Sequence, residues 1–373
     1  MTHQAGRESP TAFVRRYTKT WIHALATAAL TAFGTLTFID TRFAAVAIAA
    51  YTLPPLVLYF RGTADTEASS TSATASERDT DSKPSTRWSL ETGPTESHLN
   101  DATIAGTTAY AVGEGGVVLT SDDAGWSSLL SDGPRAQSTS LRAVDSAGDD
   151  SVWTAGASGT VARIDVETGQ HTDYSEPASD TSNLVDIAAA TGSGGETVFL
   201  ADGSGRIRRG MYHDGEMAWD DPVVPGSGSS IAGLTMVDDS VGWVCDTSQQ
   251  VFRTTDGGRT FEQVPVDAVS GTMTDVTATA EATWVTTDDG LVYHHDGDTW
   301  TPRSVADGGL QSIAGWDRRS LSGGDDGTLY ERDAGQEWER ALTPTSSSID
   351  GVAVAETSAV AVGAGGTVLE RQY

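Results

Sequence analysis

Two clusters of arginine are the side chains in this sequence best suited to bind a charged partner. The first holds Arg206, Arg208 and Arg209, and the second holds Arg318 and Arg319. The chain of 373 residues has 52 acidic and 23 basic side chains, a formal net charge of -29. In so acidic a chain, a local concentration of guanidinium groups predicts a docking patch for an acidic protein partner. The alternative interpretation, which we favour, is that these arginines pair with carboxylates of the same surface.

The histidines and the paired acidic residues give no metal site. His294 and His295 are neighbours in a predicted strand and point to opposite faces, so they cannot easily chelate one ion, and we expect solvated positions. Acidic pairs in glycine turns are expected throughout so acidic a surface. These pairs are Asp288-Asp289 and Asp325-Asp326. We therefore predict no metal and no cofactor.

Other classes of ligand and of covalent chemistry are also disfavoured. Gly113, Gly115 and Gly116 imitate a nucleotide-binding pattern, but a predicted strand follows them, so no helix N-terminus would meet a phosphate. The strong negative charge repels nucleic acid. Cys245 is the sole cysteine and excludes an internal disulfide or a multi-cysteine metal site.

The composition resembles that of proteins from salt-in halophiles, including archaeal ones. Lys19 and Lys83 are the two lysines, and the other 21 basic residues are arginines. A carboxylate-rich surface stays hydrated in molar salt, whereas long lysine stems would add apolar surface to it. The net negative charge is therefore explained first by a solvent rich in salt, and only second by the kind of partner that the protein binds.

The N-terminal region predicts a membrane anchor. After a basic tail (1–20), residues 21–39 and 43–60 are apolar stretches without an acidic or basic side chain, and the first would span roughly 28 Å as a helix. They predict a two-helix transmembrane hairpin. Arg15, Arg16 and Lys19 before the first span place both termini in the cytoplasm by the positive-inside rule. The alternative is an export signal, which would place the following domain outside. Residues 61–85, rich in Ser, Thr and charge, predict a disordered linker.

From Leu99 onward the sequence repeats seven times. The repeats begin 42, 43, 47, 42, 37 and 39 residues apart, and each has a short apolar opening followed by two strand-like segments around a glycine turn. A period near 40 with about four short strands is typical of propeller blades. The openings start at Leu99, Leu141, Leu184, Ile231, Met273, Leu310 and Ile349. We therefore predict an all-β fold, a seven-bladed β-propeller over residues 86–373.

The last repeat lacks its outer strand, and the N-terminal segment is expected to supply it. Trp300 and Trp338 precede the next opening by 10 and 11 residues, and Trp88 precedes Leu99 by 11. A strand near Trp88 would thus complete the last blade. Ring closure of this kind removes exposed sheet edges.

The fourth repeat carries a turn motif made of Asp256, Gly257, Gly258, Thr260 and Phe261. The aspartate is expected to accept backbone N–H bonds within its own turn, a structural function. This arrangement resembles the Asp-box (BNR) repeat propellers, which include sialidases, sortilin-type receptors and the photosystem II stability and assembly factors. The order of opening, hairpin and Asp-box looks most like the assembly-factor branch. That resemblance implies fold more strongly than activity.

These observations favour a membrane-anchored propeller that acts as a protein-interaction or assembly platform without catalysis. A sialidase-like enzyme would need three converging arginines and a Phe or Tyr-Arg-Ile-Pro stretch, and no such stretch is present. Two alternatives stay open, an outward-facing glycan-binding or sialidase-like module and a structural envelope protein. The topology rule favours a propeller on the cytoplasmic side of the cell membrane.

Overall fold

The computed structural model of the protein describes residues 87–373. The basic tail, the two predicted membrane spans and the predicted linker, residues 1–85, lie outside the described residues. Within residues 87–373, no helix has both the length and the apolar composition needed to cross a membrane.

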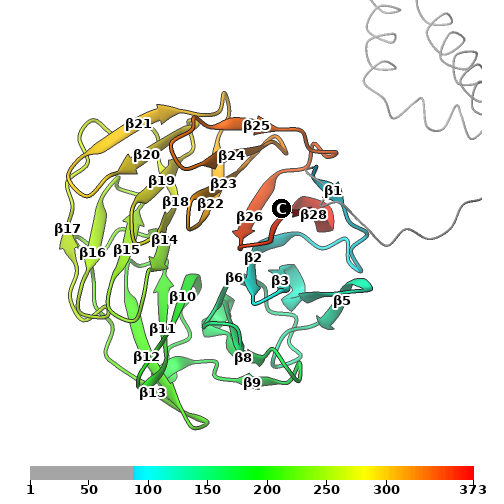
Figure 1. Ribbon diagram of the computed structural model, residues 1–373. Coiled ribbons are helices and arrows are strands. Elements are labelled where there is room, and N and C mark those ends of the chain that lie inside the picture. The colour runs from blue at the N-terminus through cyan, green and yellow to red at the C-terminus, as the bar shows by residue number, and fades with distance from the viewer. Residues whose placement is uncertain (1–86) are drawn as a thin grey trace, which may run out of the picture. The chain divides into compact units, whose positions relative to one another are not determined.

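Seven antiparallel sheets of four strands are arranged around a central opening (Figure 1). Blade 1 is built from β2 (Leu99–Ala105), β3 (Thr108–Gly113), β4 (Val118–Asp122) and β5 (Gly125–Leu130). Blade 2 is built from β6 (Leu141–Ser146), β7 (Ser151–Gly156), β8 (Val161–Asp165) and β9 (His171–Asp173). Blade 3 is built from β10 (Leu184–Gly192), β11 (Gly195–Asp202), β12 (Ile207–His213) and β13 (Glu216–Trp219). Blade 4 is built from β14 (Ile231–Met236), β15 (Gly242–Asp246), β16 (Val251–Thr254) and β17 (Glu262–Gln263).

Blades 5 to 7 complete the ring. Blade 5 is built from β18 (Met273–Ala278), β19 (Thr283–Thr287), β20 (Leu291–His295) and β21 (Trp300–Ser304). Blade 6 is built from β22 (Leu310–Trp316), β23 (Arg319–Gly324), β24 (Leu329–Asp333) and β25 (Glu339–Ala341). Blade 7 is built from β26 (Ile349–Val354), β27 (Ser358–Gly363), β28 (Thr367–Gln372) and β1 (Ser89–Leu90). Four short 3-10 turns are η1 (Glu114–Gly116), η2 (Ala157–Gly159), η3 (Pro177–Ser179) and η4 (Ala364–Gly366).

The predicted ring closure is confirmed. Strand β1 pairs antiparallel with β28, Ser89 opposite Glu370 and Leu90 opposite Leu369. The outermost strand of blade 7 therefore comes from the start of the described chain and the other three from its end. Each of the seven predicted openings is the first residue of an innermost strand.

Aromatic and aliphatic side chains pack between successive blades. Trp153, Trp243 and Trp284 occupy equivalent positions in the second strand of blades 2, 4 and 5, with at most 6% of their surface exposed. Trp153 belongs to a core cluster with Leu184 and Val198 of blade 3. The tryptophans therefore do pack blade to blade, as expected.

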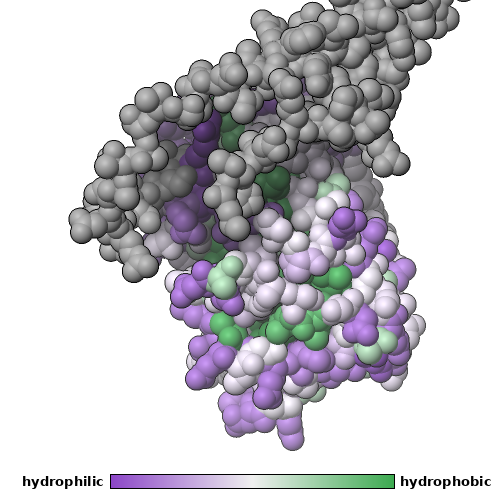
Figure 2. Space-filling model, turned by 90° about the vertical axis from the view of Figure 1, so that its right-hand side faces the viewer, coloured by the Kyte–Doolittle hydropathy of each residue, from purple (hydrophilic) through white to green (hydrophobic). Residues whose placement is uncertain are grey.

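The part of the surface that is coloured by hydropathy in Figure 2 is mainly polar. On the side of the molecule that carries β1 and β5, hydrophilic side chains surround a smaller group of hydrophobic ones (Figure 2). This distribution is consistent with the excess of acidic side chains in the sequence.

One hairpin departs from the glycine pattern. Gln249 stands where other repeats have glycine, and it adopts the left-handed region at φ 65°. Its side-chain Nε2 donates a hydrogen bond of 2.6 Å to the carbonyl of Gly271. This bond to the chain leading into blade 5 offsets part of the steric cost of a side chain in that region.

Candidate functional site

The innermost strands enclose a central channel with a volume of about 710 Å³. All seven contribute side chains to its wall. In each of them the pairing register shifts directly after the first residue, which is a β-bulge. A bulge re-aims the side chains that follow it, so the third residue of each strand has an equivalent place in the ring.

The two ends of the channel differ in chemistry. The second residues of the strands, five of the seven of them polar, form a mainly polar end, whereas the last residues and the turns beyond them form a mainly apolar end. The polar end includes Asn100, Arg142, Thr274, Gln311 and Asp350. The apolar end includes Ile104, Met236, Val237, Trp316 and Val354.

Four aspartates in the channel wall connect successive blades. Asp101 accepts a hydrogen bond from the backbone N–H of Val144 in the next blade at 2.8 Å, and a second from Ala102 at 2.8 Å in its own strand. The three other aspartates repeat this double acceptance. Their bonds to the next blade are Asp145 to Ala189 at 2.8 Å, Asp186 to Leu234 at 2.6 Å and Asp275 to Ile313 at 2.8 Å.

Enclosure by the seven blades changes the acidity of these carboxyl groups. Burial raises the pKa of Asp145 to about 6 and that of Asp275 to about 7. It raises the pKa of Asp101 and Asp186 as well, and the negative charge of Asp275 adds to both shifts. All four side chains are partly exposed to the channel, so water there moderates the effect. The wall is therefore a place where added negative charge is disfavoured.

Three blade junctions lack such an aspartate. A side chain at Gly351 would place its Cβ atom 2.4 Å from Cα of Asp101, and one at Gly233 would place it 2.6 Å from the backbone nitrogen of Val276. The next strand thus occupies the space that the carboxylate fills elsewhere. Ser312 takes the third position in blade 6, and its buried hydroxyl has no hydrogen-bond partner among the described residues.

The second predicted arginine cluster lies beside the apolar end of the channel. Arg318 is exposed in the turn between β22 and β23, next to Asp317, which adopts φ 47°. Arg319 lies over the ring of Tyr373 with its guanidinium carbon 3.8 Å from the ring centroid, and it donates to the carbonyl of Glu356 at 2.7 Å. Trp316, the last residue of β22, is 50% exposed.

The first predicted arginine cluster makes ion pairs within blade 3 and the chain leading into it. Arg206 pairs with Asp202 at 2.7 Å and with Asp180 at 3.3 Å. Arg208 pairs with the same Asp180 at 3.3 Å, and Arg209 pairs with Asp220 at 2.8 Å. Their charges are therefore matched locally, which corresponds to the alternative interpretation of this cluster.

The turn motif of blade 4 has the expected geometry. Oδ1 of Asp256 accepts the backbone N–H groups of Arg259 at 3.0 Å and Thr260 at 2.9 Å, and Oδ2 accepts the Thr260 hydroxyl at 2.7 Å. These bonds lower the pKa of Asp256 to about 2, with those to Thr260 the largest cause. Gly257 and Gly258 both adopt positive φ, at 68° and 75°. Asp256 thus ties its own turn together through three hydrogen bonds.

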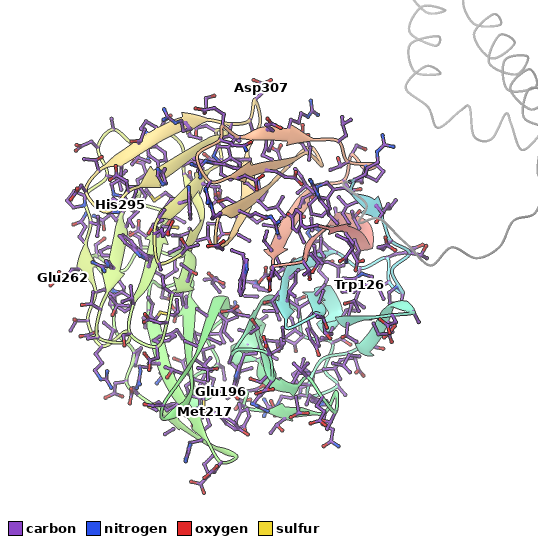
Figure 3. The ribbon with its side chains drawn as sticks, viewed as in Figure 1. Trp126, Glu196, Met217, Glu262, His295 and Asp307 are labelled. Carbon is purple, nitrogen blue, oxygen red and sulfur yellow. The ribbon has the colours of Figure 1, made fainter. Side chains whose placement is uncertain are left out.

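The two neighbouring histidines point to opposite sides of blade 5, but the expectation of solvated positions was wrong. His294 stacks on Trp284 with ring centroids 5.4 Å apart, and His295, labelled in Figure 3, lies 4.8 Å from the ring of Trp300. His295 has only 8% of its surface exposed. Burial lowers the pKa of both. Residues 87–373 contain no group of three or more acidic, histidine or cysteine side chains placed to hold a metal.

Sequence reasoning missed the aspartates of the channel. Their signal was present, because Asp101, Asp186 and Asp275 each stand two residues after the start of a repeat. Asp145 stands four residues after its start, and its partner Ala189 lies two positions further along the next strand than the partners of the other three. Only the hydrogen bonds of the folded ring show that these carboxylates reach the next blade.

The fold and the channel define this molecule as a seven-bladed β-propeller. No protein-family model matches the chain, and no curated protein matches its sequence. Solved structures do match, at sequence identities that establish the fold alone. One is a catalytically inactive histidine-to-alanine variant of virginiamycin B lyase from Staphylococcus aureus with quinupristin, with a TM-score of 0.63 and 13% identity over 77% of this chain and 100% of that one.

Two other matches are propellers of different kinds. YCF48 bound to a D1 peptide aligns with a TM-score of 0.61 and 15% identity, over 79% of this chain and 96% of that one. The WD40 propeller domain of Doa1 aligns with a TM-score of 0.58 and 12% identity, over 76% of this chain and 94% of that one.

Proposed function

We propose that this protein is a membrane-anchored propeller that binds a protein partner at the apolar end of its channel and catalyses no reaction. The observation that carries the proposal is the exposed Trp316 at that end, beside Arg318 and Arg319. Tryptophan and arginine are the side chains most enriched among residues that dominate binding energy at protein interfaces.

The turn that carries these residues is held in a defined shape. Asp317 occupies a backbone region that is unfavourable for a residue with a side chain. Strain of this kind persists only where the surroundings enforce it, and it clusters at functional sites. Arg319, fixed by Tyr373 and Glu356, anchors one side of the turn, so Trp316 is presented with little conformational freedom to lose on binding.

The chemistry of the channel argues against catalysis. Each of the four aspartates that connect successive blades already accepts two backbone hydrogen bonds. Among the described residues that line it, none is a histidine and Arg142 is the single arginine. A sialidase-like site with converging arginines therefore has no counterpart in this wall.

The similar propellers support an interaction function in general terms. One was solved with a D1 peptide and another is a WD40 domain, whereas the lyase shows that the same fold also supports an enzyme. The Asp-box geometry of Asp256 supports a place among the Asp-box propellers, and the order of opening, hairpin and Asp-box in the repeats favours the assembly-factor branch. Anchoring by residues 21–60 would confine the docking surface to the membrane and raise its effective concentration for membrane-associated partners.

Site-specific photocrosslinking in cells tests the proposal. A benzophenone amino acid replaces Trp316 in the full-length chain, and a matched protein carries it at Leu342, which is 76% exposed and does not line the channel. A protein adduct of one defined mass from position 316, absent from position 342, supports the docking surface. The same adducts from both positions, or none from position 316, would overturn it.

Protease accessibility of residues 61–85 tests the membrane topology. Cleavage only after cell lysis supports a cytoplasmic propeller, whereas shedding of the propeller from intact cells overturns that part of the proposal. The second outcome would move the search for a partner to the cell envelope.

A further inference from the structure

A second cavity lies between blades 5 and 6, apart from the central channel, and has a volume of about 190 Å³. Blade 5 lines it with Trp284, His294 and Arg303, and blade 6 with Arg332, Glu337 and Trp338. Two tryptophans and two arginines in so small a space are an uncommon combination in a chain with 52 acidic residues.

Strand pairing explains why the blade 5 residues share one wall. Trp284 lies directly opposite His294, and Val292, two residues earlier in the same strand, lies opposite Arg303. Side chains directly opposite each other, or two residues apart, lie on the same face of a sheet. The Trp284 and His294 rings are nearly parallel, with an interplanar angle of 26°.

The two arginines have no carboxylate partner within the described part of the chain. Arg332 donates from Nε to the backbone carbonyl of Gln336 at 2.9 Å, and Arg303 makes no hydrogen bond or ion pair there. Both positive charges act on His294, and together with burial they lower its pKa. The cavity therefore combines His294 with two guanidinium groups that form no ion pair in the described chain, and Glu337 is the one acidic side chain among its described lining residues.

The junction between blades 2 and 3 shows how an arginine beside the equivalent tryptophan is neutralised internally, at the position that His294 occupies in blade 5. Trp153 lies opposite Arg163, which pairs with Glu196 of the next blade at 2.6 Å. Glu196 stands three residues before Phe199, the central residue of its strand, and Figure 3 labels it in blade 3. The same position in blade 6, three residues before Leu321, is Arg318. Blade 6 thus brings no acid where blade 3 does.

We propose that the cavity between blades 5 and 6 binds a small aromatic carboxylate. Its volume exceeds the roughly 150 Å³ of an engineered cavity that holds benzene, so one ring with a carboxylate fits. The ring would lie among Trp284, His294 and Trp338, and the carboxylate would accept hydrogen bonds from Arg303 and Arg332. Glu337 offsets one of the two arginine charges at the cavity, so one further negative charge balances the site, which favours a monocarboxylate.

The test is a fluorine NMR titration of 4-fluorobenzoate with the full-length protein in mild detergent and molar potassium chloride. Saturable line broadening is expected. The Arg303→Gln and Arg332→Gln variants should each weaken binding roughly 10-fold or more, the effect of losing one charged hydrogen bond. The control, Arg142→Gln, removes an exposed arginine of blade 2 and should bind as the wild type does.

Two comparison ligands define the outcomes that would overturn the proposal. Neutral 4-fluorobenzyl alcohol reports partition into detergent or apolar surface, so equal binding of the alcohol rules out a carboxylate site. A fluorinated glucuronate carries the carboxylate on a saturated ring, and tighter binding of this sugar acid would contradict the aromatic preference. Broadening that the Arg303→Gln and Arg332→Gln variants leave unchanged places the ligand elsewhere. Thermal unfolding of each variant confirms that it is folded.

Discussion

Trp88 donates its indole N–H to Oε1 of Glu331 at 2.5 Å, across 243 residues of sequence. Trp88 precedes the closing strand β1, and Glu331 belongs to β24 of blade 6. The same glutamate also pairs with Arg371 in β28 of blade 7. One carboxylate of blade 6 therefore holds both the segment that closes the ring and the strand on which it closes.

We expect Trp88→Ala to destabilise the propeller more than any other single change near the closing segment. Trp88 is 4% exposed, and replacing a buried tryptophan with alanine costs about 3–5 kcal/mol. Trp88→Phe keeps most of the ring but loses the hydrogen bond to Glu331. Its smaller effect should be about 1–3 kcal/mol, in the range for a bond to a charged group. Chemical denaturation measures both.

The control for this prediction is Leu90→Ala in the closing strand β1, two residues further along the chain. Leu90 is 52% exposed, and such surface changes usually stay within about 0.5 kcal/mol. Equal destabilisation by Trp88→Ala and Leu90→Ala would mean that the closing segment is not secured by the tryptophan.

Gly351→Ala should separate blades 7 and 1. The added Cβ atom would lie 2.4 Å from Cα of Asp101, a backbone atom that cannot move alone. Overpacking of this kind costs about 1–3 kcal/mol or more. The matched control is Gly203→Ala, where the nearest atom would be 3.8 Å away. A thermal shift as large for Gly203→Ala as for Gly351→Ala would refute the steric argument.

Asp256→Ala should weaken the blade 4 turn by about 1–3 kcal/mol, because the backbone N–H groups of Arg259 and Thr260 lose a charged acceptor. The lowered pKa of Asp256 gives this contribution a pH signature. The native state binds the proton less tightly than the unfolded chain does, so the stabilisation is present above about pH 4 and is lost toward pH 2.

The measurement is the unfolding free energy of wild type and Asp256→Ala at several pH values. The difference between them should shrink as the pH falls from about 4 to about 2. A difference that stays constant over that interval would show that the carboxylate charge is not the stabilising element.

The channel aspartates should show the opposite dependence on pH. The pKa of Asp275 is raised to about 7, so the native state binds its proton more tightly than the unfolded chain, whose carboxyl titrates near 4. The stability that comes from this protonation is complete below about pH 4 and is lost as the pH rises through about 7. Allowing for water in the channel, we expect about 1–2 kcal/mol.

Asp275→Ser tests this dependence because serine already occupies the equivalent position in blade 6. The variant should lose part of the decrease in unfolding free energy between pH 4 and pH 7 that the wild type shows. Asp307→Ser, in an exposed loop labelled in Figure 3, is the control and should keep the full decrease. Identical pH profiles of Asp275→Ser and wild type would exclude Asp275 as the titrating group.

The sequence alone determined the number of blades, the start of each innermost strand and the origin of the closing strand. These features depend on short-range patterns, namely alternation of apolar residues, glycine turns and a regular spacing. The same patterns recur in every repeat. The turn of Asp256 was predictable for the same reason, since its hydrogen bonds join residues at most four apart. The sequence around Trp316 and Arg318, by contrast, gave no indication that these residues lie at the mouth of a channel.

Only the tertiary structure decided what lies between the blades. The bond from Val144 to Asp101 joins residues 43 apart, and the cavity of Trp284 and Trp338 needs two sheets to meet face to face. It also decided which arginines are neutralised, because Arg209 finds Asp220 while Arg303 finds no acid in the described chain. Charge pairing and enclosure depend on distances between separate repeats, and those distances are set by the closed ring as a whole.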